Sequence, residues 1–112
     1  MTEARIVTNA ELQKALDWLR DSAGDLASAK ARAVKAGHML KHVEAFEFKL
    51  SDATSNDKRQ ADARTSDAYV DAINEDALAA GELAKLQALR EAAALKIEAW
   101  RSEQANYRSM RI

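Results

Sequence analysis

The chain has 112 residues, a net charge of −1, 47% hydrophobic but only 5% aromatic residues, and neither Cys nor Pro. The lack of Cys excludes disulfides, a thiol nucleophile and thiolate metal sites, and the near-neutral charge excludes a global attraction to nucleic acid. No apolar run is long enough to span a bilayer and no signal-peptide core follows Met1, so we expect a cytoplasmic protein.

Helix-breaking residues are scarce, with three Gly and no Pro, and no alternating run of β-branched residues predicts a strand. We therefore predict an all-α fold in a single helical domain, residues 1–112. Much of the hydrophobic content is Ala, which buries little area per residue. Long helices in close contact suit this composition better than a thick globular core.

Residues 1–7 are expected to form a flexible arm, followed by a first helical arm over 8–50. Thr8 and Glu11 have capping-box spacing at its start. Two rows of mostly apolar residues then recur every seven positions, which predicts a coiled-coil seam. We expect a continuous or gently broken helix, although the stretch Ser22–Asp25 around Gly24 could form a kink or a short break with Asp25 as a new cap. The rows are Leu12, Leu19, Leu26, Ala33 and Leu40, and Ala15, Ser22, Ala29, Ala36, Val43 and Leu50.

The polar stretch 51–57 predicts the main turn, with Ser55 or Asn56 capping the next helix. A second helical arm is expected over 58–110, with Gly81 as the point where it bends or stops. Helices of this length need a packing partner, so we predict a long antiparallel helical hairpin that forms homo-oligomers through Ala- and Leu-rich seams. The seam residues are Leu12, Leu19, Leu26, Leu40, Leu83, Leu86 and Ile97.

A basic stretch in the first arm, residues 30–42, is a candidate nucleic-acid-binding surface. It carries Lys30, Arg32, Lys35 and Lys41 with no acidic residue among them. On a helix such a stripe can follow a phosphate backbone. The alternative is a solvated face beside the seam.

Residues 51–81 carry a net charge of −4. This acidic region is either a soluble face or a docking surface for a basic patch on a neighbouring subunit.

His38 and His42 lie one helical turn apart, which is the spacing of two zinc ligands. A third ligand is lacking, so we predict no metal and no cofactor. The chain also has no Gly-rich phosphate loop, no nucleophile motif and no acid–base pair in a pocket-forming context. We therefore expect that the protein is not an enzyme.

The C-terminal cluster mixes two aromatic residues, Trp100 and Tyr107, with Arg101, Arg108 and Arg111. Aromatic rings stack on bases and Arg pairs with phosphates, so this mixture is typical of single-stranded nucleic-acid binding. Trp100 and Tyr107 also lie seven residues apart on one helix face. This spacing favours the alternative that the two aromatic residues are packing anchors.

The ending ALKIEAWRSEQANYRSMRI resembles the ends of phage proteins found near recombination functions. The whole layout resembles the UvsY recombination mediator family of T-even phages, with a basic helix (30–42), a polar break (51–57) and later helices (65–101). This chain is less basic than that family. The resemblance implies a ring-like oligomer that binds single-stranded DNA and helps a recombinase to load onto it.

Our leading hypothesis is therefore a phage-type accessory protein of DNA recombination or replication. It would contact single-stranded DNA through the Lys and Arg residues named above, and a recombinase would be its protein partner. One alternative is a protein-binding adaptor or inhibitor that acts through its helical faces. Another is a structural coiled-coil scaffold that assembles without a ligand.

Overall fold

The computed structural model describes residues 5–110, and it contains four helices and no strand within that range. They are α1 (Asn9–Asp21), α2 (Ala23–Leu50), α3 (Asn56–Thr65) and α4 (Asp67–Met110). The prediction of an all-α helical hairpin fold is therefore confirmed. No helix in the described part of the chain is both long and apolar enough to cross a membrane.

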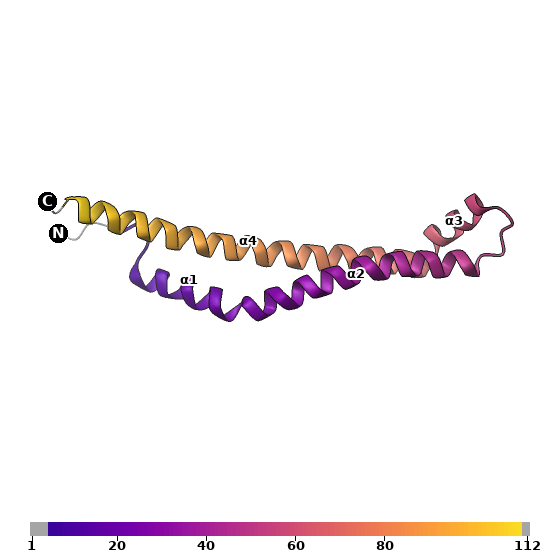
Figure 1. Cartoon of the computed structure of the whole chain (residues 1–112), viewed down its shortest axis with the longest axis horizontal. Helices are drawn as coiled ribbons and strands as arrows, with labels where there is room; N and C mark the ends of the chain where they lie inside the picture. The colour runs from indigo at the N-terminus through magenta and orange to yellow at the C-terminus, as the bar shows by residue number, and fades with distance from the viewer. Residues whose placement is uncertain (1–4, 111–112) are drawn as a thin grey trace. The chain divides into compact units, whose positions relative to one another are not determined.

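The helices group into two compact units, each of which is an antiparallel hairpin. One unit joins the chain up to Leu26 with residues from Lys85 onward, so that α1 lies beside the later turns of α4 (Figure 1). The other unit is Ala27–Ala84, in which α2 lies beside the earlier turns of α4 and α3 packs near the chain reversal (Figure 1).

The start of α1 is fixed by a cap and by contacts to α4. The Glu11 N–H donates to Thr8 Oγ1 at 3.1 Å, which is half of the predicted capping box. Val7 is only 4% exposed, and the Ile6 N–H donates to Glu103 Oε2 at 2.9 Å. Ile6 and Val7 of the expected flexible arm thus contact the rest of the unit, and residues 1–4 of that arm lie outside the described range.

The first arm breaks at Ser22, at the start of the stretch Ser22–Asp25 in which we considered a kink or a short break. Gly24 and Asp25 both lie in the first turn of α2, so Asp25 is not its cap. The break is stabilised from α4, because Arg90 Nη1 donates to the Leu19 carbonyl oxygen at 2.7 Å and to Ser22 Oγ at 2.6 Å. Carbonyl groups in the last turn of a helix lack intrahelical partners, and the Arg90 guanidinium supplies one.

The turn and the second arm also differ from the predicted boundaries. The non-helical stretch is 51–55, because the Lys58 N–H donates to Ser55 Oγ at 3.2 Å and α3 begins at Asn56. The second arm is interrupted at Ser66. The Ser66 backbone is extended, with a ψ angle of 149°. Its hydroxyl accepts a hydrogen bond from the Tyr69 N–H at 3.2 Å. Ser66 thus caps α4 in the way that Ser, Thr, Asp and Asn do. Gly81 neither stops nor interrupts α4.

The inner faces of the hairpins follow the seven-residue repeat. Ala15, Ser22, Ala29 and Ala36 are buried, and the predicted seam residues are half-buried on the inner rows of their own units. In α4 the less exposed positions recur at steps of three and four, as in a coiled coil. No large side chain within residues 5–110 is fully buried. The inner row of α4 is Tyr69, Ala72, Asp76, Ala79, Leu83, Leu86, Arg90, Ala93, Ile97, Trp100, Gln104 and Tyr107.

Candidate nucleic-acid interface

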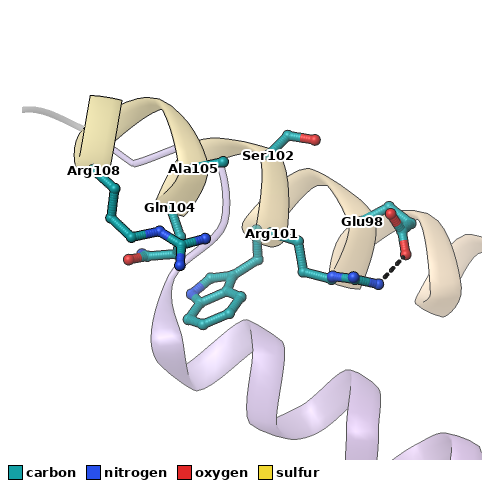
Figure 2. Close-up of a pocket in the computed structure, with 7 residues that line it drawn as sticks. Glu98, Arg101, Ser102, Gln104, Ala105 and Arg108 are labelled. Atoms are coloured by element: carbon teal, nitrogen blue, oxygen red, sulfur yellow. Dashed lines mark hydrogen bonds and ion pairs between the residues drawn. The ribbon is translucent and has the colours of Figure 1, made fainter. Parts of the chain in front are cut away.

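The C-terminal turns of α4 carry an open pocket of about 600 Å³ that three of the predicted site residues line together. These are Trp100, Arg101 and Arg108. Figure 2 labels Arg101 and Arg108 together with four other residues that line the pocket. Arg101 and Arg108 lie seven residues apart on a continuous helix, and therefore on one face about 10.5 Å apart along its axis. Ser102 and Ala105, which also line the pocket, are small and leave room between the longer side chains.

Trp100 occupies an inner-row position of α4 and is half-buried. Its Nε1 donates to Asn9 Oδ1, at the first residue of α1, over 3.2 Å. The polar edge of the indole is thus held by α1, while the residue also lines the pocket. A Trp in this position is both a packing anchor and an aromatic surface that a flat ring can approach.

The two guanidinium groups of the pocket differ in their partners. Arg101 Nη1 lies 3.0 Å from Glu98 Oε1, with side chains that are 68% and 64% exposed. Exposed ion pairs at this spacing contribute little stability, so a phosphate can replace Glu98 at low cost. Arg108 has no ion pair with another described residue, and its side chain extends toward Gln104 (Figure 2).

Tyr107 does not line this pocket. Tyr107 is half-buried, and the Arg5 guanidinium lies over its ring at 5.6 Å from the centroid. This cation–π contact makes Tyr107 an anchor for the residues that precede α1. Arg111 lies outside the described residues.

The basic stretch of α2 separates into paired and unpaired side chains. Arg32 reaches across its hairpin to Glu75 at 2.8 Å and to Glu82 at 2.6 Å. The hydrogen bonds that its guanidinium donates to Glu75, and next to Glu82, raise the pKa of Arg32. Lys30, Lys35 and Lys41 are exposed and have no ion pair with another described residue. Arg32 therefore serves its own hairpin, whereas the three Lys side chains face solvent.

His38 and His42 are both exposed on α2. Within residues 5–110 no group of three His, Cys, Asp or Glu side chains is arranged to hold a metal ion.

A second surface, which the sequence reasoning missed, is a groove of about 780 Å³ between α1 and the later turns of α4. Trp18, Ala15, Leu89 and Ala93 form its apolar part, with Lys96 among the charged residues at its edge. Leu89 is 48% exposed. The signal in the sequence was Trp18 itself, because a large aromatic residue directly beside the inner row widens the apolar face of α1.

Comparison with protein-family models, with curated proteins and with solved structures gives no match. The structure itself defines the chain as an all-α protein built of antiparallel helical hairpins.

Proposed function

We propose that this protein is a non-enzymatic accessory factor of DNA recombination or replication that binds single-stranded DNA. The observation that carries the proposal is the grouping of Trp100, Arg101 and Arg108 around one open pocket. Non-specific single-strand binding combines aromatic surfaces for bases with cationic groups for the backbone, and this pocket offers both.

The electrostatics of the pocket agree with a polyanionic ligand. From Lys85 to Met110, α4 carries five basic and three acidic residues. Phosphates of single-stranded DNA at the pocket would contact Arg108 directly and would compete with Glu98 for Arg101. Lys30, Lys35 and Lys41 on α2 offer further phosphate contacts in the other unit.

The biological part of the proposal rests on the resemblance to the UvsY recombination mediator family. Under this proposal the protein forms a homo-oligomer on single-stranded DNA and assists a recombinase to load. Binding of single-stranded DNA by the purified protein is the step that can be tested first.

The test is a fluorescence-anisotropy titration of labelled single-stranded and duplex oligonucleotides over a salt series. We expect tighter binding to the single strand, and roughly tenfold weaker binding for the double variant Arg101→Glu/Arg108→Glu. The slope of log K against log salt should fall by about 0.7 for each phosphate that the variant no longer neutralises. Lys85→Glu is the matched control, because Lys85 is an exposed cation of α4 outside the pocket.

Two results would contradict the proposal. One is the absence of binding at low salt, where phosphate contacts are strongest. The other is a decrease in affinity per reversed charge that is as large for Lys85→Glu as for the pocket variant, which would show a diffuse charge effect and no site.

A second candidate function is a protein-binding adaptor, which the groove at Trp18 and Leu89 favours. A helix or loop with an apolar anchor fits a groove of this kind. Leu89→Asp should then abolish capture of the partner protein and leave single-strand binding unchanged, whereas Arg101→Glu/Arg108→Glu should do the reverse. Proximity labelling in cells, followed by the anisotropy assay on the same variants, separates the two functions.

A further inference from the structure

One polar side chain of the pocket on α4 has no hydrogen-bond partner among residues 5–110. Gln104 lines the pocket and is half-buried, and its amide group makes no hydrogen bond within that range. The single-strand binding proposed above uses aromatic and cationic groups and gives this amide no role. Because both its donor and its acceptor remain available, Gln104 is suited to contact a ligand in the pocket.

Gln104 lies between Trp100 and Arg108 on one strip of α4. Each of the two is four residues away, and residues at this spacing on a helix surface have Cβ atoms about 5–6 Å apart. All three residues line the same pocket. Figure 2 shows the side chains of Gln104 and Arg108 next to each other on one side of the helix. An aromatic ring, an amide and a guanidinium therefore follow one another along α4, one turn apart.

The ring of Trp100 is oriented by a hydrogen bond to α1. Its Nε1 donates to Asn9 Oδ1 at 3.2 Å, which holds the polar edge of the indole in place. A base that stacks on this ring lies within one helical turn of Gln104. Bases of a single strand are unpaired, so their edges are open to contacts with side chains. The amide of Gln104 is the group placed to read such an edge.

The amide differs from the other long side chains of the pocket because it both donates and accepts. The guanidinium groups of Arg101 and Arg108 only donate, and they suit the carbonyl oxygens of guanine, cytosine and thymine. Adenine has no carbonyl oxygen and presents the N6 amino group beside the N7 acceptor, which a Gln amide binds in a bidentate manner. Guanine presents two acceptors on the same edge and would leave Gln104 Oε1 unpaired.

We propose that Gln104 gives the pocket a preference for adenine, with the base stacked on Trp100 and its N6 and N7 bound by the amide. This inference rests on the proposed function, because it requires a single strand in the pocket. The two fused rings of a purine also cover more of the indole than a pyrimidine does. Arg108, one turn further along α4, contacts a phosphate of the same strand.

Fluorescence-anisotropy titrations of the full chain with four oligonucleotides test the inference. Each is a labelled oligothymidine strand whose central positions hold adenine, cytosine, guanine or thymine. We expect the wild type to bind the adenine strand roughly fivefold more tightly than the thymine strand, at the lower end of what one bidentate contact to a base contributes. Gln104→Met should remove most of this difference, because Met has a similar length and lacks the amide.

Gln87→Met is the matched control, since Gln87 is an exposed residue of the same helix outside the pocket. It should keep the adenine preference of the wild type. Gln104→Met should fold, because Gln104 lies on the inner row of α4, where the heptad pattern favours an apolar side chain. Circular dichroism at 222 nm checks that both variants keep their helices.

The outcomes separate this inference from the function on which it rests. Equal binding of all four strands by the wild type would contradict the adenine preference and leave single-strand binding intact. An adenine preference that persists in Gln104→Met would contradict the role of the amide, as would tightest binding to the guanine or the cytosine strand. A failure to bind any strand at low salt, where phosphate contacts are strongest, would overturn both proposals.

Discussion

At the scale of single residues, Arg90 shows how one side chain stabilises an interruption of a helix. It occupies an inner-row position of α4 where the heptad pattern favours an apolar side chain. Its guanidinium donates to the Leu19 carbonyl oxygen and to Ser22 Oγ. Ser22 is buried, at 4% exposure, so its hydroxyl needs a partner within the chain.

Replacing Arg90 with Ala should lower the free energy of unfolding by about 1.5–3 kcal/mol, because the variant lacks the hydrogen bonds to a charged group and leaves the buried Ser22 hydroxyl without this partner. Urea denaturation followed by circular dichroism measures the change. Lys96→Ala, at an exposed position of the same helix, is the control and should stay within about 0.5 kcal/mol of wild type. A similar decrease in both variants would contradict the role given to Arg90.

A single substitution tests the hydrogen bond of Trp100 to α1 separately from its proposed stacking on bases. Trp100→Phe keeps an aromatic ring and removes the Nε1–H that donates to Asn9 Oδ1. We expect stability to fall by about 0.5–1.5 kcal/mol, the net contribution of one hydrogen bond. Single-strand affinity should fall less than for Trp100→Ala. Equal affinities for the Phe and Ala variants, in the anisotropy assay, would show that the ring does not contact bases.

At the scale of elements, the start of α4 depends on Ser66. Its hydroxyl accepts from the Tyr69 N–H and donates to the Ala63 carbonyl oxygen at 2.7 Å, so it joins the end of α3 to the start of α4. Ser66→Ala should cost about 0.5–2 kcal/mol, as the removal of an N-cap does. Thermal or urea unfolding measures this change in the free energy of unfolding. Ser102→Ala, at an exposed helical position, is the control and should not destabilise the protein.

A substitution at Gly81 tests whether α4 is continuous, because it should stabilise the helix where Ser66→Ala should destabilise it. Gly81 lies inside the helix, and a Cβ added there meets no atom within 4 Å. Gly81→Ala should therefore raise the free energy of unfolding by about 0.5–1 kcal/mol, because Gly is unfavourable in a helix interior and nothing opposes the added methyl group. Urea denaturation measures the change. A lower free energy of unfolding for Gly81→Ala than for wild type would indicate that α4 needs Gly81 in order to bend.

The element scale also shows what the sequence could and could not predict. The rows through Leu12 and Ala15 were predictable, because a seven-residue repeat over several turns has one packing solution. In α4 two stripes compete, since Ile73, Ala77 and Ala80 repeat as regularly as Tyr69, Ala72 and Asp76. Apolar character favours the first stripe, yet the second faces inward. Packing against α2 decides which stripe of α4 faces inward, and the sequence pattern of α4 alone does not specify it.

The grouping of residues in the C-terminal pocket was predictable from the sequence, whereas the ion pairs of the basic stretch on α2 were not. Trp100, Arg101 and Arg108 lie close in sequence on one helix, so their pocket follows from helical spacing. The pairing of Arg32 with Glu75 and Glu82 joins residues more than forty positions apart. Only the register of α2 against α4 brings these side chains together, and so local sequence patterns could not separate Arg32 from Lys30 and Lys35.

At the scale of the whole molecule, the chain buries small side chains and exposes large ones. Within residues 5–110 the buried hydrophobic residues are Val7 and six Ala, while Phe46, Leu78, Leu95 and other large apolar side chains are more than half exposed. Since hydrophobic stabilisation grows with the apolar area removed from water, burial within a single chain contributes little to the stability of this fold. Association of copies is one means of covering more of that apolar surface.

This leads to a prediction about thermal stability. If copies associate when folded and not when unfolded, mass action stabilises the folded state, by about 2.7 kcal/mol when the partner is at 100 times its Kd. For a domain of this size 1 kcal/mol shifts Tm by about 4–8 °C. Raising the protein concentration about a hundredfold should therefore raise Tm by several degrees in circular dichroism at 222 nm. A wild-type Tm that does not change with concentration would show that the folded chain is stable without a second copy.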